Sequence, residues 1–387
     1  MLASVRSNGE IYRLFWPYIE YGQHLGRFWS GLRITTKEEE SFTRWFHLNS
    51  WNTAQHYLEH TNILETTFSS ASHAIKVIQR DFVLPHCDVL VRLYEFKNEG
   101  NSSEKISFWT YFSFNIEESQ HYDCGYFEPS NNSLVFYRRD IYLAATGTGH
   151  TLTGYQLGRR GTDTDPFQAA SHGTLSGNKD NIRETAGSLS WDLGELAPGQ
   201  TQTFSLYLAA GNSKEDVWKT LADTTCKSGT ELLNETASYW RDWLHRKPAT
   251  PENSIGQATY IRSLLAVKLM CSKETGASIA APEFDPYYLA CGGYGYCWPR
   301  DSVYVAAAMD EAGYHDIAGQ FYQFASSVQD QDGSWHQRYF TSGFIASTWG
   351  QQIDQTGSVL WGYRHHYSLT QDRVFLEQIW ASLYAGA

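Results

Sequence analysis

Hydrophobic and polar residues follow two different periods along the chain. Up to about residue 245, apolar positions recur every second residue in short runs, of which 74–83 and 88–96 are the clearest. This alternation is typical of strands that bury one face. After about residue 255 the period lengthens to 3.6 residues, as in helices with one apolar face. The pattern therefore predicts a β domain followed by a helical domain.

Strands and turns alternate at short intervals in the first part of the chain. Residues Met1 to Phe15 predict a hairpin that turns at Ser7-Asn8-Gly9. Further strands are expected at 106–116, 133–145, 187–193 and 204–210. Short strands separated by turns rich in Gly, Asn and Pro favour an antiparallel β-sandwich.

Some polar stretches of the β domain carry no clear period. Gly149 to Asn181 is rich in Gly, Asp and Thr and predicts a long surface loop. Its Asp163 and Asp165 lack the spacing of an EF-hand, so no calcium site is expected there. Glu117-Glu118 follows a predicted strand and is expected to be solvated.

Helices are expected at the end of the β domain and through the rest of the chain. They are predicted at 213–224, 231–245, 255–272, 302–312, 315–328, 355–369 and 373–384. The helix at 302–312 should have its N-cap near Asp301-Ser302 and end at Gly313. The charged, proline-containing segment around 246–252 predicts a linker. The expected domains are a β-sandwich with terminal helices at 1–245, a linker at 246–255, and a helical domain at 256–387.

The segment from Cys291 to Asp301, CGGYGYCWPRD, carries the most distinctive chemistry. Its glycines permit backbone conformations closed to other residues, and its aromatic residues offer flat apolar faces. Arg300 places five N–H donors beside the acceptor carboxylate of Asp301. A sugar ring needs such a combination, because its C–H face stacks on aromatic rings and its hydroxyls need both donors and acceptors. The alternative is a buried aromatic turn in which Arg300 and Asp301 pair only with each other.

The run Gly292-Gly293-Tyr294-Gly295-Tyr296, followed by Trp298-Pro299-Arg300-Asp301, resembles the first-loop signature of glycoside hydrolase family 15. That family contains glucoamylases, glucodextranases, isomaltose glucohydrolases and a group of trehalases. The resemblance extends over the whole chain and implies a β-sandwich followed by an (α/α)6 barrel. Only about five of the barrel helices are predicted here. The chain is therefore expected to hold about the first half of the barrel and to be truncated at its C-terminus.

The resemblance implies roles for particular residues. Asp301 would accept hydroxyl hydrogens from the glucose at the non-reducing end, and Arg300 would donate to its hydroxyls. Tyr294 and Trp298 would line the sugar ring. The segment 349–354, WGQQID, resembles the family's Trp-Gly…Gln-x-Asp segment but differs in spacing and lacks an arginine. It adds three candidate substrate-binding residues, Trp349, Gln352 and Asp354.

No catalytic residue is predicted within the chain. In the family, the acid and the base are glutamates on later loops of the barrel. After Asp301 the sequence holds only Glu311 and Glu377, each within a predicted helix and without an adjacent carboxylate. The acid and the base are therefore expected beyond residue 387.

Composition narrows the classes of partner. The net charge is −12, which disfavours nucleic acid and anionic membranes. The first residues lack the order of a signal peptide, no apolar run reaches 18 residues, and a cytoplasmic location is expected. The six cysteines are scattered without a CxxC pair, and His365-His366 point in different directions on a helix. Free thiols, no metal and no cofactor are expected, and the oligomeric state stays open.

The sequence thus favours an exo-acting, inverting α-glucosidase that releases glucose from small α-glucans or disaccharides such as isomaltose. A disaccharide phosphorylase is an alternative, because such enzymes also join a β-sandwich to an (α/α)6 barrel. The third possibility is a non-catalytic carbohydrate-binding fragment. It predicts weak glucose binding without turnover.

Overall fold

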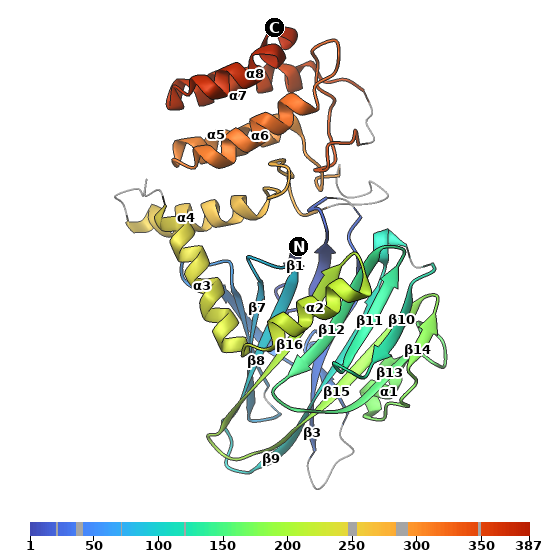
Figure 1. The fold of residues 1–387 in the computed structure, drawn as a ribbon. Coiled ribbons are helices and arrows are strands. Elements are labelled where there is room, and N and C mark those ends of the chain that lie inside the picture. Colours follow the sequence, from blue (N-terminus) through green and yellow to red (C-terminus); the bar gives the residue numbers. More distant parts are fainter. Residues whose placement is uncertain are drawn as a thin grey trace. The chain divides into compact units, whose positions relative to one another are not determined.

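The chain folds into two compact units, which are drawn in Figure 1. The computed structural model describes residues 1–20, 22–35, 42–70, 72–119, 121–246, 254–283, 293–346 and 350–387. The first unit comprises Met1–Leu14 and Gly22–Trp240, and the second comprises Phe15–Tyr21 and Arg241–Ala387. Most of the predicted linker at 246–255 lies outside the described residues.

The first unit consists mainly of two antiparallel sheets. The seven-stranded sheet has the order β1-β2-β3-β9-β15-β13, with β4 paired to β3. The nine-stranded sheet has the order β14-β10-β11-β12-β16-β8-β7-β6-β5. The strands of the first sheet are β1 (Leu2–Val5), β2 (Ile11–Phe15), β3 (Leu25–Thr35), β4 (Arg44–Trp45), β9 (Glu104–Phe114), β13 (Thr151–Arg159) and β15 (Thr185–Leu196). Those of the second are β5 (Asn52–Tyr57), β6 (Leu64–Ser69), β7 (Ile75–Val83), β8 (Val89–Asn98), β10 (Cys124–Glu128), β11 (Ser133–Arg138), β12 (Ile141–Thr148), β14 (Asp180–Ile182) and β16 (Thr201–Gly211).

The central strand β8 is buried along most of its length, although its sequence alternates. Val91 and Leu93 pack into an apolar cluster with Val217 and Leu221 of α2 (Lys214–Thr225). Residues on the other face of β8, such as Tyr94, pack with aromatic side chains of the facing sheet, including Phe108. Helices cover part of the nine-stranded sheet, so both faces of its central strand are apolar.

Several features of the first unit differ from the prediction. The predicted strand at 133–145 is two strands, β11 and β12, and β10 was not predicted. Strands β5 and β6 were not predicted, because their sequences are mostly polar. In the structure β5 is largely exposed. The predicted loop at 149–181 is wrong: the segment contains β13, α1 (Pro166–His172) and β14. Helix α1 begins where Asp165 accepts a hydrogen bond from the amide of Phe167, with proline at the first helical position. Strand β13 has its amides and carbonyls paired with β15.

The expectation that Glu117-Glu118 is solvated is also wrong for Glu118. Both residues lie in a short 3₁₀ turn, η1 (Ile116–Glu118), and have positive φ angles. Glu117 forms an ion pair with Arg138. Burial raises the pKa of Glu118 to about 7, and its Oε1 is buried. The polar doublet therefore turns one carboxyl inward.

The second unit is helical. It contains α4 (Ser254–Leu269), α5 (Pro299–Glu311), α6 (His315–Ser327), α7 (Ile353–Thr370) and α8 (Arg373–Gly386). The division between the two units falls within α3 (Gly229–His245). Helix α5 packs against α6 and α7, and α8 packs against α6 and α7. The core between them includes Val303, Phe321, Val359, Tyr363 and Phe375. The predicted fold class, an antiparallel β-sandwich followed by a helical domain, is confirmed.

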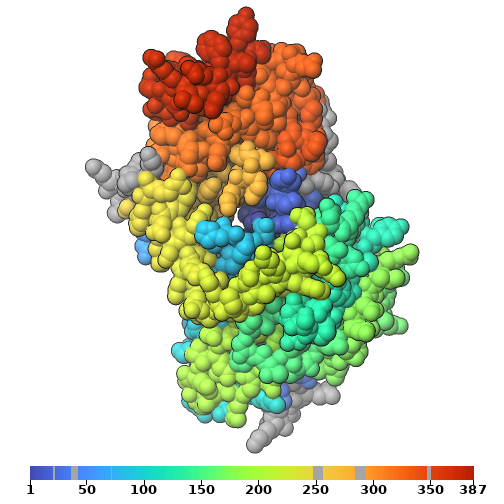
Figure 2. Space-filling view, in the orientation of Figure 1, coloured from blue at the N-terminus to red at the C-terminus, as the bar shows by residue number. Residues whose placement is uncertain are grey.

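Apolar side chains are exposed on several helices of this unit. Helix α8, in red in Figure 2, lies at the surface, and its Val374, Trp380 and Tyr384 are exposed. None of the described helices is long and apolar enough to cross a lipid bilayer.

Candidate functional site

The predicted sugar-binding loop leads directly into α5. Trp298 is the N-cap residue of this helix and Pro299 takes its first helical position. The predicted N-cap near Asp301-Ser302 is therefore wrong. Pro299 has a φ angle fixed by its ring at a helical value, so the helix already begins there. Arg300 and Asp301 lie in the first helical turn, where a carboxylate is favoured by the helix dipole. The indole Nε1 of Trp298 donates a hydrogen bond of 3.2 Å to the carbonyl of Gly293 and closes the loop.

Three chain segments pair with one another next to the start of this helix. Cys297 and Tyr339 exchange backbone hydrogen bonds of 2.9 and 2.8 Å, and Tyr339 also pairs with Ile345. The amide of Ala280 donates to the carbonyl of Tyr296. Burial raises the pKa of the Cys297 thiol to about 12, so this free cysteine is unreactive at neutral pH. These backbone bonds give the loop a rigid base.

A buried arginine lies against the aromatic side chains of the loop. Tyr296, Trp298 and Ala346 form a small apolar cluster. The guanidinium carbon of Arg338 lies 4.7 Å from the centre of the Tyr296 ring and 5.6 Å from that of Trp298. Arg338 is only 1% exposed. Cation–π contacts of this kind are strongest where water is excluded.

The polar residues of the site gather where α5 and α7 begin. A guanidinium nitrogen of Arg300, Nη1, forms an ion pair with Asp354, and its Nε lies 4.0 Å from Asp301. The backbone amide of Arg300 donates a hydrogen bond of 2.8 Å to Oε1 of Gln355. Gln355 in turn donates to Oε1 of Gln352 at 3.0 Å. The cluster therefore joins two carboxylates, one guanidinium and two amides at adjacent helix starts.

The structure brings together some of the predicted site residues and separates others. Arg300, Asp301, Gln352 and Asp354 belong to the cluster just described. Trp298, the N-cap residue of α5, is 7% exposed, whereas Tyr294 is 45% exposed. Trp349 lies outside the described residues.

The two glutamates considered for catalysis lie elsewhere. Glu311 is the last residue of α5, about 15 Å from Asp301 at 1.5 Å per residue. Its carboxylate lies 3.3 Å from His365. Glu377 is exposed on α8. Neither residue joins the polar cluster.

Sequence reasoning missed three residues that build the site. Gln355 follows Gln352 by one helical turn, a spacing that could have indicated a shared face. Arg338 lies in a polar loop whose partners the sequence does not reveal. Glu20 accepts hydrogen bonds from Thr341 Oγ1 at 2.7 Å and from the amide of Ser342 at 2.9 Å. It lies 321 residues before Thr341, so no local pattern could have paired them.

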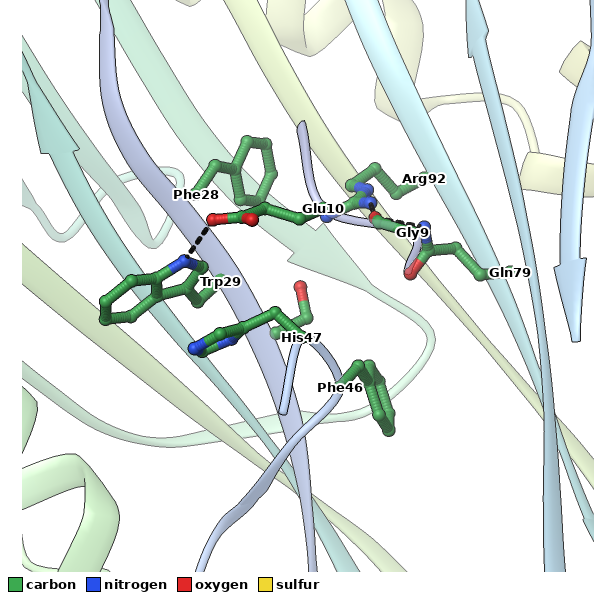
Figure 3. A pocket seen from close by; sticks show the side chains of 9 residues that line it. Gly9, Glu10, Phe28, Trp29, Phe46, His47, Gln79 and Arg92 are labelled. Carbon is green, nitrogen blue, oxygen red and sulfur yellow. Dashed lines mark hydrogen bonds between the residues drawn. The ribbon is translucent and has the colours of Figure 1, made fainter. Parts of the chain in front are cut away.

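The first unit contains a small cavity of about 10 Å³, which is shown in Figure 3. Glu10 accepts a hydrogen bond of 2.7 Å from Nε1 of Trp29, whose ring stacks on His47 at 4.2 Å. Arg27 lies 4.7 Å from the centre of the Trp29 ring, and burial lowers the pKa of His47. The volume is about that needed for one water molecule, and it is too small for a sugar ring.

Two family models match the chain. The model of the glucodextranase N domain matches residues 32–245, and the model of glycosyl hydrolases family 15 matches residues 254–339. An uncharacterized glycosyl hydrolase of Methanocaldococcus jannaschii is 27% identical over 404 residues, covering 100% of this chain and 61% of the relative. A trehalase of Thermoplasma acidophilum is 34% identical over 94 residues, covering 23% of this chain and 16% of the trehalase.

Solved structures show the same fold. A bacterial glucoamylase complexed with acarbose superimposes with a TM-score of 0.76 at 19% identity, covering 97% of this chain and 55% of the glucoamylase. A human-microbiome protein assigned as a kojibiose phosphorylase gives a TM-score of 0.59 at 13% identity, covering 89% of this chain and 46% of that protein. The chain therefore spans about three fifths or less of the length of these relatives.

Proposed function

Because the chain belongs to glycosyl hydrolase family 15 and carries the N domain of glucodextranases, we propose that the complete protein is an exo-acting, inverting α-glucosidase. It would release glucose from the non-reducing end of small α-glucans or disaccharides such as isomaltose. The proposal concerns the complete protein, since the chain spans 61% of its M. jannaschii relative.

The observation that carries the proposal is the polar cluster at the starts of α5 and α7. Asp301 stands in the first turn of α5 beside Arg300, whose guanidinium is oriented by Asp354. Asp354 engages Nη1, so other N–H groups of the guanidinium can donate to sugar hydroxyls. Asp301 can accept two hydroxyl hydrogens. The exposed Tyr294 supplies an apolar ring for the sugar's C–H face.

In this mechanism the cluster holds the terminal glucose while other groups cleave the bond. Each charge-assisted hydrogen bond to Asp301 would contribute about 1.5–3 kcal/mol. The terminal ring distorts toward an oxocarbenium-like state, so part of this energy would appear only in the transition state. Inversion also needs a carboxylic acid and a carboxylate about 6.5–9.5 Å apart. The proposal assigns neither role to a residue of this chain.

The test is to follow hydrolysis of isomaltose, maltose and trehalose by the complete protein with anomer-resolved NMR. An inverting α-glucosidase releases the non-reducing-end glucose as the β anomer, so β-glucose should exceed its equilibrium share early in the hydrolysis of isomaltose or maltose. Trehalose should give α- and β-glucose in equal amounts, because its leaving glucose keeps the α configuration. An early excess of α-glucose over these expectations, or no glucose from any of these substrates, would contradict the proposal. In parallel, calorimetric titration of the 387-residue chain with acarbose tests the cluster itself, with binding expected for the wild type and lost in Asp301→Asn.

A disaccharide phosphorylase is the second candidate, and the fold similarity to the protein assigned as a kojibiose phosphorylase favours it. Such an enzyme replaces the attacking water with phosphate. The complete protein would then release glucose 1-phosphate from kojibiose, and only when phosphate is present. Binding of acarbose without turnover of any disaccharide by the complete protein would instead favour a non-catalytic carbohydrate-binding protein.

A further inference from the structure

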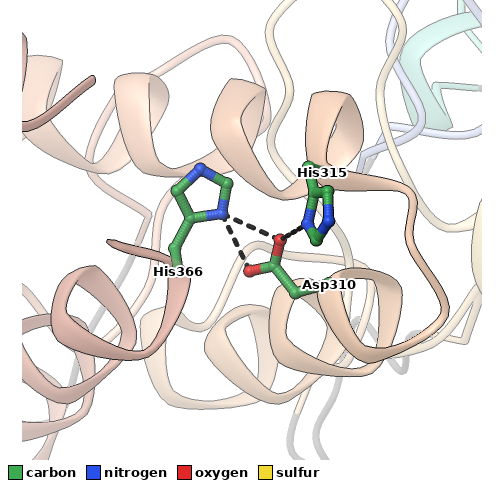
Figure 4. Close-up of side chains that lie close together, drawn as sticks. All are labelled: Asp310, His315 and His366. Atoms are coloured by element: carbon green, nitrogen blue, oxygen red, sulfur yellow. Dashed lines mark hydrogen bonds and ion pairs between the residues drawn. The ribbon is translucent and has the colours of Figure 1, made fainter. Parts of the chain in front are cut away.

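Three potential metal ligands converge where α5, α6 and α7 meet, as Figure 4 shows. Asp310 lies in the last turn of α5, His315 begins α6, and His366 lies in the second half of α7. Oδ1 of Asp310 lies 2.9 Å from Nδ1 of His315 and 2.8 Å from Nδ1 of His366. Each residue offers one ligand atom, and these three atoms all lie within 4.8 Å of one another. The group is separate from the polar cluster around Asp301.

The carboxylate at the centre of this group is fully buried. The Asp310 side chain has no exposed surface, and that of His366 is 4% exposed. In the described part of the chain, the two imidazoles are the ionisable groups that contact it, and neither lysine nor arginine does so. A buried carboxylate is costly unless a cation or several hydrogen bonds compensate its charge. A bound divalent cation would supply that compensation.

Aromatic side chains fix the position of the His366 ring. The His366 ring packs edge-on against Phe375, with centroids 4.4 Å apart, and lies 5.4 Å from the ring of Tyr322. The Tyr322 hydroxyl is buried and has no hydrogen-bond partner among the described residues. It lies against Gly362, one helical turn before His366. A polar atom thus remains unsatisfied beside the group.

The turn between α5 and α6 brings the first two ligands together. Gly313 has a φ angle of 84°, and its amide donates a hydrogen bond of 2.8 Å to the carbonyl of Asp310. This conformation favours glycine and reverses the chain between Asp310 and His315. The His315 side chain is 38% exposed, which gives an ion a route from solvent.

We propose that Asp310, His315 and His366 bind a divalent transition metal ion, and that Zn²⁺ fits them best. Two imidazole nitrogens and one carboxylate oxygen are a common ligand set for zinc, with water in the fourth position. Zinc bonds of about 2.0–2.1 Å would place neighbouring ligand atoms roughly 3.3 Å apart. The distances from Oδ1 of Asp310 to Nδ1 of His315 and of His366 are a few tenths of an ångström shorter than this. The half-exposed His315 ring can move by that amount. Binding through Nδ1 requires each neutral ring to carry its hydrogen on Nε2.

The ion would link three helices at the end of α5 remote from Asp301, so it would take no part in the proposed hydrolysis. This inference does not depend on the proposed glucosidase activity. It differs from the sequence-based expectation of no metal, which considered the neighbouring pair His365-His366. Those two residues do point apart, since His365 contacts Glu311 while His366 contacts Asp310.

The test is calorimetric titration of the chelator-treated 387-residue chain with Zn²⁺, and separately with Co²⁺ monitored by its visible d–d absorption. We expect one ion per chain with micromolar or tighter affinity, and a rise in Tm of a few degrees at saturating zinc. His315→Gln should weaken binding by at least about tenfold. His365→Gln is the matched control and should leave the affinity unchanged.

Asp310→Asn serves as a second variant, with folding checked by circular dichroism. The site is supported if zinc no longer raises the Tm of His315→Gln or of Asp310→Asn while the variant keeps its fold. No stoichiometric binding by the wild-type chain would overturn it. Equal binding by wild type and His315→Gln would also overturn it, because the ion would then be held by thiols or by other surface imidazoles.

Discussion

The side chain of Gln355 in α7 caps the first turn of α5 by accepting a hydrogen bond of 2.8 Å from the amide of Arg300. The N-cap residue of α5, Trp298, has no side-chain capping bond of its own. An amide in the first helical turn has no partner within its helix, so this one is satisfied by a neighbouring helix. Gln355 has no exposed surface. The bond therefore couples the position of Asp301 to the start of α7, where Asp354 lies.

Replacing Gln355 with methionine tests this coupling. Methionine has a similar volume and removes the acceptor, which leaves the partly buried Arg300 amide without this partner. The free energy of unfolding of the helical unit should fall by about 1–3 kcal/mol. Urea denaturation, combined with hydrogen exchange of the first turn of α5, measures it. Gln351→Met is the control, because Gln351 is exposed. Equal stability of the two variants would show that the capping bond contributes nothing.

Asp301→Asn tests the binding role of the carboxylate in the complete enzyme. The substitution keeps the shape and removes the charge that strengthens hydrogen bonds to the sugar. We expect kcat/KM to fall by roughly 10²–10⁴, with kcat affected as well as KM, because part of the interaction forms only in the transition state. Tm measured on the same sample separates this loss from unfolding. Asp316→Asn, which removes an exposed ion pair with Arg246, is the control. Unchanged kinetics would remove Asp301 from the site.

Glu20→Gln tests how the loop after Arg338 is held. Glu20 accepts bonds from Thr341 and from both the amide and the hydroxyl of Ser342. The neutral amide of glutamine accepts weaker hydrogen bonds than a carboxylate does. The free energy needed to open the loop should therefore fall by about 1 kcal/mol. Faster hydrogen exchange across 339–346 would show this. Glu59→Gln, at an exposed position, should leave the exchange of that segment unchanged. If both variants behave alike, Glu20 does not hold the loop.

Much of the helical unit was predictable because its helices repeat apolar residues with a regular period. The predicted helices at 302–312 and 315–328 match α5 and α6 to within three residues. Their boundaries differ from the prediction where a single residue sets the helix end, as at Pro299, which begins α5 three residues earlier than predicted. The polar strand β5 and the segment containing β13 could not be predicted. Their conformations depend on pairing with distant strands, and the strand propensity of a segment does not reveal such pairing.

The same distinction applies to the candidate site. Arg300 and Asp301 were found because they stand within one recognisable stretch of sequence. Gln355, Arg338 and Glu20 act through partners that only the folded chain brings near. Composition gave no sign that Arg338 would be buried against aromatic rings. Residues that position a site are therefore harder to predict than those that would touch a ligand.

A buried acid in the first unit should make stability depend on pH. Both carboxylate oxygens of Asp123 are buried without a well-formed hydrogen bond in the described part of the chain. Burial raises the pKa of Asp123 from 3.8 to about 7, although the backbone of Ile116 and the charges of Arg138 and Arg160 act in the opposite direction. The folded chain then holds this proton at pH values where the unfolded chain has lost it. Stability therefore falls as the pH rises from about 4 to about 7, and is greatest on the acid side of that range.

Asp123→Asn removes this dependence, because the amide cannot ionise. At pH 8 the variant should be more stable than the wild type by about 1–2 kcal/mol, after allowance for screening by solvent. The difference should shrink as the pH falls toward and below the unfolded pKa of 3.8, where the wild-type carboxyl becomes protonated in the unfolded state as well. Hydrogen exchange of β10 and β11 at several pH values follows the first unit directly. Asp140→Asn, at an exposed position, is the control and should show no such trend. An Asp123→Asn variant whose advantage stays constant from pH 4 to pH 8, or which is destabilised at pH 8, would show that the wild-type carboxyl is not held protonated by burial.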